Sequence, residues 1–197
     1  PDSGEIRIDG QAVHLRTPND SMAAGIETVY QTLAVCPALD IGTNLFLGRE
    51  RRRSDIFGKL FRMLDKGAME GVARTQMNDL GIMTLQDIGQ AVETLSGGQR
   101  QGVAVARAAA FGSRVVIMDE PTDGLDPNQK HLVRNLITEM AREKAIIVST
   151  HILEEVEAVC TRAVIINRGR IVADGTAEEL MRRDPNHGAV AIRIAAD

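Results

Sequence analysis

Residues 95–126 read L-S-G-G-Q-R-Q-G-V-A-V-A-R-A-A-A-F-G-S-R-V-V-I-M-D-E-P-T-D-G-L-D, and the rest of the chain can be placed relative to this stretch. Leu95–Gly98 predicts a Ser-Gly-Gly turn that runs into an Ala-rich helix over about Gln99–Phe111. Val115–Met118 is apolar, too short for a helix and rich in β-branched residues, which predicts a strand buried on both faces. The stretch therefore predicts a turn, a helix and a buried strand in close succession.

Two carboxylates, Asp119 and Glu120, stand where this strand ends, before Pro121, which cannot extend a strand. Ligands of open α/β sheets bind outside the carboxyl ends of parallel strands. Ser96 can cap the helix, and the backbone N–H groups at its start favour an anion. We therefore expect a phosphate site in which Asp119 holds Mg²⁺, directly or through water, and Glu120 orients or deprotonates an attacking water.

Three motifs in this stretch resemble those of the ABC transporter ATPases. Leu95-Ser96-Gly97-Gly98-Gln99 resembles the family's signature, Val115–Glu120 its Walker B strand, and Gly124-Leu125-Asp126 its D-loop. A Ser-Gly-Gly alone is usually only a turn, but the three motifs in this order and at this spacing are specific. The resemblance implies an α/β fold of P-loop NTPase type, with a parallel-rich sheet, flanking helices and an inserted helical signature subdomain.

The resemblance also implies roles for the matching residues, with ATP and Mg²⁺ as cofactors. Asp119 would serve the metal, and Glu120 would be the catalytic base. A second ABC ATPase domain would complete a dimer, in which the signature of one domain reaches the γ-phosphate bound by the other. The residues expected to bind nucleotide or to couple the two sites are Leu95, Ser96, Gly97, Gly98, Gln99 and Asp126.

Two further polar residues follow predicted strands. Gln31 ends Ile26–Tyr30 and resembles the Q-loop glutamine, whose amide oxygen would enter the Mg²⁺ shell or bond the attacking water. Taken alone, Gln31 would be an ordinary polar residue at a strand end. His151 follows Ala145–Val148, predicted as another buried strand, and resembles the H-loop histidine. It would touch the γ-phosphate and hold Glu120 and the water in place.

Cap and turn signals predict several local structures. Asp126 and Pro127 are predicted as N-cap and first residue of a helix, and Gly169 as the special position of a hairpin turn. Thr176 and Glu179 form a predicted capping box. The run Arg49–Arg53 is predicted either as a solvated loop or as a contact with an acidic segment of a membrane partner.

The expected organisation is one incomplete ABC ATPase domain over 1–183, with the helical subdomain inserted at about 38–105, and a short extension at 184–197. No G-x-x-x-x-G-K-[ST] occurs in the sequence, and none of its lysines, Lys59, Lys66, Lys130 and Lys144, follows such a loop. The N–H groups and lysine of that loop normally cradle the phosphates. We therefore expect the N-terminal strands and P-loop to be missing, the sheet to expose edges, and the chain alone to be inactive.

Two parts of the chain resemble two different subfamilies of ABC ATPase. Residues 29–50, V-Y-Q-T-L-A-V-C-P-A-L-D-I-G-T-N-L-F-L-G-R-E, resemble the ATP-binding subunits of bacterial monosaccharide importers. From Asp123 onward, D-G-L-D-P-N-Q, S-T-H-I-L-E-E-V-E-A-V-C and I-I-N-R-G-R-I-V-A-D-G resemble ABC-2 type exporter ATPases. The importers usually carry Ala-Ala-Leu at the D-loop, where this chain has Asp-Gly-Leu. The implied function is an ATP-hydrolysing subunit that drives a transporter, of sugar-importer type by its first part, through nucleotide-dependent dimer closure. A natural or engineered hybrid is one hypothesis, and an exporter ATPase or an inactive regulatory or structural fragment are the alternatives.

The amino-acid composition limits the classes of partner that we expect the chain to bind. Hydrophobic residues make up 44% and charged residues 25% of the 197 residues, which is ordinary for a globular protein. The net charge of −4 and the absence of Trp disfavour a nucleic-acid surface. No apolar run reaches the roughly 18–20 residues that cross a bilayer, so we expect no direct membrane insertion. The resemblance implies transmembrane permease subunits as partners and a peripheral location at the cytoplasmic face of the inner membrane.

Two other classes of ABC ATPase fit less well. Chromosome-maintenance and DNA-repair ATPases usually carry a very long insertion between Q-loop and signature, and here the interval from Gln31 to Leu95 is short. Ribosome-acting ABC proteins normally show two cassettes in one chain. Cys36 and Cys160 lie at no metal-ligand spacing and are predicted to be structural thiols in a reducing compartment.

Overall fold

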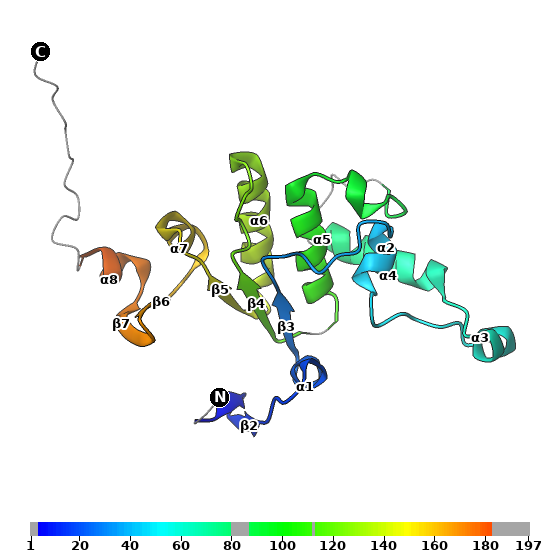
Figure 1. Ribbon diagram of the computed structural model, residues 1–197, viewed down its shortest axis with the longest axis horizontal. Helices are drawn as coiled ribbons and strands as arrows, with labels where there is room; N and C mark the ends of the chain where they lie inside the picture. The colour runs from blue at the N-terminus through cyan, green and yellow to red at the C-terminus, as the bar shows by residue number, and fades with distance from the viewer. Residues whose placement is uncertain (1–3, 80–86, 112, 183–197) are drawn as a thin grey trace, which may run out of the picture. The chain divides into compact units, whose positions relative to one another are not determined.

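The computed structural model describes residues 4–79, 87–111 and 113–182, in two compact units, Pro1–Ser149 and Thr150–Asp197. The centre of the first unit is a parallel sheet of three strands in the order β3 (Ile26–Val29), β4 (Val115–Asp119) and β5 (Ala145–Ser149) (Figure 1). All three predicted strands are confirmed. Because the strands run parallel, their carboxyl ends meet at one edge of the sheet.

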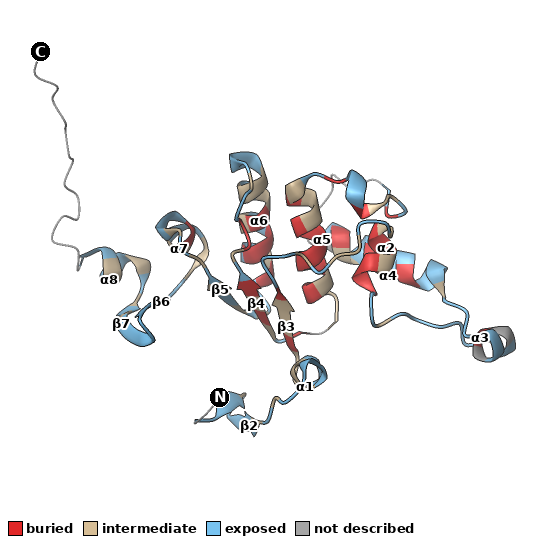
Figure 2. Ribbon diagram, viewed as in Figure 1, coloured by how far each residue is buried: buried red, intermediate tan, exposed pale blue. Residues whose placement is uncertain are grey.

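One face of β4 is closed by packing. Val116 and Met118, two residues apart and therefore on the same face, are fully buried. Two of the long helices of this unit, α5 (Gly97–Ala109) and α6 (Pro127–Met140), pack against each other and carry buried apolar stripes. Figure 2 shows buried residues along α5, α6, β3 and β4. The core of the sheet is therefore its central strand and these helices.

The prediction that β5 is a buried strand is wrong. Ile147 is 55% exposed, and Ala145 and Ser149 are exposed on the same side of the strand. Within the part of the chain that the structure describes, β5 has one hydrogen-bonded neighbour, β4. The exposed edge expected from the sequence is thus found here. In register, Thr28, Ile117 and Ile147 form a row on this side of the sheet, which we call the open face.

The N-terminal part of the first unit is a hairpin followed by a short helix. Two short strands form an antiparallel pair, β1 (Ile6–Ile8) and β2 (Gln11–Val13). The helix α1 (Pro18–Ala23) begins with a capping box of Thr17 and Asp20. Backbone N–H groups of Thr17 and Arg16 donate to the Asp20 carboxylate and lower its pKa below the usual value.

The predicted helical subdomain contains α2 (Ile41–Leu45), α3 (Ile56–Phe61), α4 (Lys66–Asp79) and the 3₁₀ turn η1 (Val92–Thr94). Helix α2 packs on α4 and α5. The apolar side chains buried here are Ile41, Leu45, Phe46, Met69, Ala73, Met77, Ile88 and Val92. Met69 and Met77 of α4 are therefore core residues.

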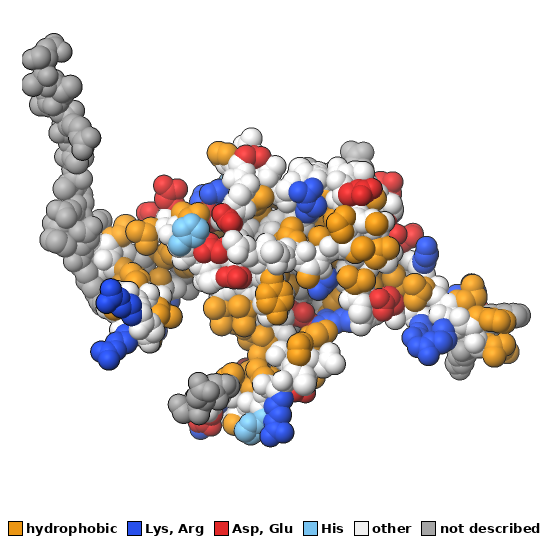
Figure 3. All heavy atoms as spheres, in the orientation of Figure 1, with side chains coloured by type: hydrophobic (Ala, Val, Ile, Leu, Met, Phe, Trp, Pro, Cys, Tyr) orange, Lys and Arg blue, Asp and Glu red, His pale blue; other side chains and the backbone are white. Residues whose placement is uncertain are grey.

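The basic run at Arg49–Arg53 is only partly a solvated loop. Arg49 is half-buried, forms an ion pair with Glu27 of β3 and lies over the Phe111 ring. Arg51 lies over the ring of Phe46. The start of the run thus packs on the sheet and core. Beyond it, α3 exposes large apolar side chains beside basic ones (Figure 3).

The second unit is described by itself. It contains α7 (Leu153–Val159), an antiparallel hairpin of β6 (Ala163–Asn167) and β7 (Arg170–Gly175), and α8 (Ala177–Arg182). The hairpin turn places both Arg168 and Gly169 at positive φ, as a type I′ turn requires, which confirms the role predicted for Gly169. The capping box of Thr176 and Glu179 is also present.

Cys160 follows α7, and burial raises the pKa of its thiol above the ordinary value, with a smaller contribution from the charge of Glu155. A raised pKa keeps the thiol protonated and unreactive near neutral pH, which agrees with a structural cysteine.

Candidate functional site

Asp119 ends β4 at the carboxyl edge of the sheet. It lies opposite Ser149, the last residue of β5, and the Ser149 hydroxyl donates to Asp119 Oδ1 at 2.5 Å. Asp119 is two residues beyond Ile117 and therefore lies on the open face. One carboxylate oxygen is thus held by the hydroxyl, while the other remains an acceptor for a ligand on an exposed side of the sheet.

Glu120 adopts a left-handed backbone, with φ at 46°. Its N–H donates to the Ser149 carbonyl at 3.0 Å, and its carbonyl accepts from the N–H of Asp123 at 3.1 Å. These two bonds fix the sharp turn that follows β4, within which Thr122 is buried. A residue other than Gly in this region costs roughly 1–3 kcal/mol and persists only where its surroundings enforce it. Strain is therefore located at the residue predicted to be the catalytic base.

Gln31 follows β3, and its Nε2 donates to Asp123 Oδ2 at 3.1 Å. The two residues are 92 positions apart in the sequence, and both side chains are exposed. The contact joins the loop after β3 to the turn after β4. The predicted metal and water residues, Gln31, Asp119 and Glu120, thus lie at the same edge of the sheet.

The signature segment begins α5. Ser96 is the N-cap, its Oγ accepting from Gln99 N–H at 3.3 Å while Gln99 Oε1 accepts from Ser96 N–H at 2.9 Å. The N–H of Gly98 donates to Oε1 of Gln129, on α6, at 3.1 Å. A Cβ on Gly98 would come within 2.7 Å of Gln129 Cβ. Gly98 is therefore required by the close approach of α6, in addition to any use of its N–H for an anion.

The D-loop lies beside the signature through the same glutamine. Asp126 is the N-cap of α6, as predicted, and accepts from the N–H of Gln129 at 2.9 Å. A Cβ on Gly97 would meet Gln129 Oε1 at 3.3 Å and Leu125 at 3.4 Å. Leu95 is buried, so its side chain belongs to the core.

His151 lies in the second unit, between β5 and α7 in the sequence, and is exposed. Its role toward Glu120 and the γ-phosphate stays a prediction.

Sequence reasoning did not identify Ser149, Asp123 or Gln129 as site residues. Asp123 gave one signal, since a carboxylate stands there where similar importers usually carry alanine. The partners of Ser149 and Gln129 are 30 and 31 positions away, and only the fold brings them together.

Among the described residues, no three His, Cys, Asp or Glu side chains converge as a metal cluster. Magnesium usually takes one or two carboxylates together with waters and substrate phosphates. A carboxylate oxygen of Asp119 and the amide oxygen of Gln31 fit that donor set. No helix in the described ranges is long and apolar enough to span a bilayer.

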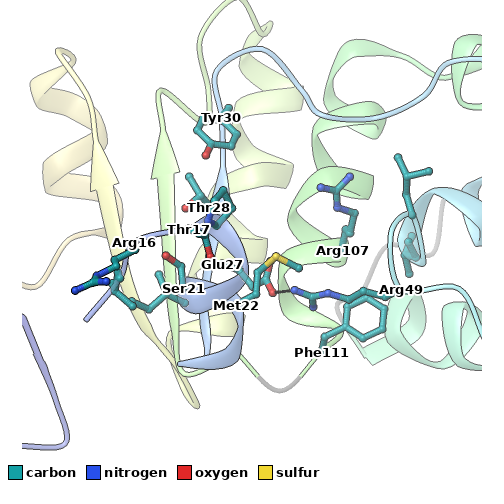
Figure 4. Close-up of a pocket in the computed structure, with 15 residues that line it drawn as sticks. Arg16, Thr17, Ser21, Met22, Glu27, Thr28, Tyr30, Arg49, Arg107 and Phe111 are labelled. Carbon is teal, nitrogen blue, oxygen red and sulfur yellow. Dashed lines mark hydrogen bonds and ion pairs between the residues drawn. The ribbon is translucent and has the colours of Figure 1, made fainter. Parts of the chain in front are cut away.

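A second feature of the first unit is a cavity of about 430 Å³ along β3 (Figure 4). Residues of the loop before α1, of α1, of β3 and of the segments around α2 and α5 line it. The ion pair of Glu27 and Arg49 lies in its wall. Tyr30, directly before Gln31, is 55% exposed and lines it as well. The guanidinium of Arg107 lines it and donates to the Ala34 carbonyl.

Comparison with known proteins gives the family. Residues 1–123 match the family described as ABC transporter. The chain belongs to the ABC transporter family. The domain is 54% identical over 171 residues to the fructose import ATP-binding protein FrcA of Rhizobium meliloti, covering 86% of this chain and 66% of FrcA. It is 37% identical to the xylose/arabinose import ATP-binding protein XylG of Sulfolobus acidocaldarius, covering 91% of this chain and 68% of XylG.

The solved structure of CbiO1 from Clostridium perfringens, part of the ABC transporter complex CbiONQ, is similar to the domain with a TM-score of 0.71. The two are 25% identical, over 93% of this chain and 70% of CbiO1. This ABC domain has the α/β fold predicted from its sequence. It spans about two thirds or less of the curated relatives it matches, falling to 36% for a ribose import ATP-binding protein of Rubrobacter xylanophilus. The exporter-like character of the segment from Asp123 onward stays a prediction.

Proposed function

We propose that this chain is part of the ATP-binding and ATP-hydrolysing subunit of an ABC importer for a monosaccharide. The relatives FrcA, XylG and the ribose import proteins, all named as sugar import ATP-binding proteins, support the substrate class. The observation that carries the proposal is the carboxyl edge of the sheet, where Asp119, Glu120 and Gln31 lie together on the ends of adjacent strands.

Bound Mg-ATP would supply the γ-phosphoryl group to be transferred to water. Asp119 would hold the metal with the oxygen that the Ser149 hydroxyl does not occupy. Glu120, fixed by its two backbone bonds, would orient or deprotonate the water, and the Gln31 amide oxygen would complete the metal or water contacts. His151 would contact the γ-phosphate, as its motif predicts.

In this proposal, the P-loop segment would cover the open face of the sheet. Parallel sheets are normally covered on both faces. The row of Thr28, Ile117 and Ile147 leads along that face to Asp119 at the carboxyl edge. A P-loop strand and helix contributed from outside these 197 residues would cover the row and bring a phosphate cradle next to Asp119. On this proposal the chain alone binds Mg-ATP poorly and turns it over negligibly.

A second ABC ATPase domain would complete the nucleotide site, and nucleotide binding would close the pair. In the signature, Ser96 accepts the cap bond through a lone pair, so its O–H proton is available to a phosphate of the opposite site. The Gly98 N–H, bonded to Gln129, would have to exchange that partner to do the same. Asp126, whose helix begins beside the signature, would relay this change between sites.

Permease subunits would be the membrane partners, at the cytoplasmic face of the inner membrane. The cavity along β3 supports this proposal, because its wall includes Tyr30, the neighbour of Gln31. Arg16 and Arg107 also line it, beside the ion pair of Glu27 and Arg49, so an apolar segment of a partner that carries an acidic group is complementary to it.

Calorimetric binding of Mg-ATP tests the proposal. The 197-residue chain is compared with a version extended upstream by a P-loop segment and carrying Glu120→Gln, which retains nucleotide. We expect the chain alone to give no heat and the extended version to bind. Micromolar binding by the chain alone, about −8 kcal/mol, would show that the P-loop is dispensable here.

The alternative is a regulatory or structural ABC domain without turnover. It predicts that an extended chain with Glu120 intact still fails to release phosphate. Release of phosphate that is abolished by Glu120→Gln, with binding retained, would exclude it.

A further inference from the structure

The hydrogen bond between the side chains of Gln31 and Asp123 is not used in the proposed reaction. The Gln31 Nε2 donates to Asp123 Oδ2 at 3.1 Å. A carboxylate has acceptors and no donors, so only the nitrogen end of the amide can face it. Because the amide group is planar, the hydrogen bond from its nitrogen to the carboxylate also fixes the position of the amide oxygen.

Asp123 is itself fixed in place. Its N–H donates to the Glu120 carbonyl at 3.1 Å, and the turn continues with a bond from Leu125 N–H to the Thr122 carbonyl at 3.4 Å. Thr122 is 2% exposed and anchors this turn in the core. Gln31, in contrast, is an exposed residue after the end of β3. The rigid partner of the pair is thus the turn after β4, and the loop residue is the one that is positioned.

We propose that Asp123 is a positioning residue that holds the nitrogen of the Gln31 amide on its own carboxylate and so leaves the amide oxygen for Mg²⁺ or water. The inference rests on the proposed function only for what the oxygen meets. An amide free to flip could turn its N–H donors toward the metal, and a donor repels a cation.

The orientation is tested by NMR on the 197-residue chain. Exchange of side-chain N–H₂ protons with water is measured at Gln31 and at Gln11, an exposed glutamine of β2 that serves as the internal control. We expect slower exchange at Gln31 than at Gln11. Asp123→Ala should bring Gln31 to the Gln11 rate, whereas Asp123→Asn, whose carbonyl can still accept, should retain the slow rate.

A donor–acceptor swap separates positioning from a general effect on the fold. Gln31→Glu alone places two carboxylates against each other and should release the loop. Combined with Asp123→Asn, it restores a hydrogen bond of opposite sense, from the Asn amide to the Glu carboxylate. Backbone amide shifts of residues 29–34 should move in the single variant and return in the double variant. Equal exchange at Gln31 and Gln11 in the unchanged chain, or no return in the double variant, overturns the proposal.

Paramagnetic broadening by Mn²⁺ alone reads the metal role separately. We expect Mn²⁺ to broaden the side-chain signals of Asp119 and Gln31, and Asp123→Ala to reduce the effect at Gln31 while leaving Asp119 broadened. Slow exchange at Gln31 without broadening by Mn²⁺ would support the positioning by Asp123 and would exclude the contact between Gln31 and the metal in the proposed function. Broadening of Gln31 that is indifferent to Asp123→Ala would contradict the positioning.

Discussion

Strands β4 and β5 lie side by side in one sheet and have similar apolar sequences, V-V-I-M-D and A-I-I-V-S, yet they are buried to different extents. Val116 and Met118 of β4 have no exposed surface, whereas Ile147 of β5 is 55% exposed. β4 has a neighbouring strand on each side, and β5 has one in the described chain. The face of the sheet on which a residue lies and the elements that cover it, not the apolar composition of the strand, decide how much each residue contributes to stability.

The largest expected effect comes from truncating the buried strand. Met118→Ala should lower the free energy of unfolding by about 2–5 kcal/mol, because it leaves a cavity in a fully packed region. The matched change Ile147→Ala removes a similar side chain from the exposed strand and should cost about 1 kcal/mol or less. Urea unfolding followed by circular dichroism measures both. Equal losses of unfolding free energy in the two variants would contradict the difference in burial between β4 and β5.

The next effect concerns the helices that close the core. Gly98→Ala should destabilise the fold by about 1–3 kcal/mol, because the new Cβ would lie 2.7 Å from Gln129 Cβ and 3.3 Å from its Cα, so α5 and α6 must separate. Gly71→Ala in α4, where the new Cβ meets nothing within 4 Å, is the matched control and should stabilise by about 0.5–1 kcal/mol. Thermal unfolding of the two variants should therefore shift in opposite directions.

A smaller effect is expected at the start of α6. Asp126→Ala removes the acceptor of the Gln129 N–H and should cost about 1 kcal/mol, while Asp126→Asn should retain most of the cap. The N–H of Gly98 reports the consequence for the signature, because its partner is the same glutamine. Its amide exchange should accelerate in the Ala variant. An unchanged Gly98 signal would show that cap and signature are independent.

The smallest effect sharpens the comparison most. Ile147→Lys should change the stability of the 197-residue chain by no more than about 0.5 kcal/mol, because the side chain faces solvent. In the P-loop-extended version the same change should cost more than about 2 kcal/mol, since a covered open face would bury an unpaired charge. A neutral result in both versions would contradict the proposed cover of the open face.

Local signals in the sequence predicted most of the fold. The caps Ser96 and Asp126, the turn at Gly169 and the three strands depend on neighbouring residues, and each is found. The burial of β5 could not be predicted, because it depends on which elements flank the strand. Likewise, the solvated loop predicted for Arg49 depended only on its charged neighbours in the sequence. Its ion pair with Glu27 joins the loop to β3, which a local pattern does not contain.

The candidate site divides in the same way. The motifs predicted Asp119, Glu120 and Gln31 at the end of a sheet, and the structure places them at one edge. The residues that hold them, Ser149 and Asp123, come from separate segments of the chain. Contacts of this kind arise from strand register and turn geometry, which a linear pattern does not contain.

The left-handed backbone of Glu120 sets stability against function at a single position. Glycine adopts this conformation without steric strain, so Glu120→Gly should relieve roughly 1–3 kcal/mol of backbone strain although it deletes the predicted base and its contacts. Random mutagenesis screened only for thermal tolerance would therefore enrich the loss of that carboxylate. On the proposed function, screening for growth on an imported monosaccharide would remove the same change. The conformation of one residue thus predicts that the two selections lead the protein to different sequences.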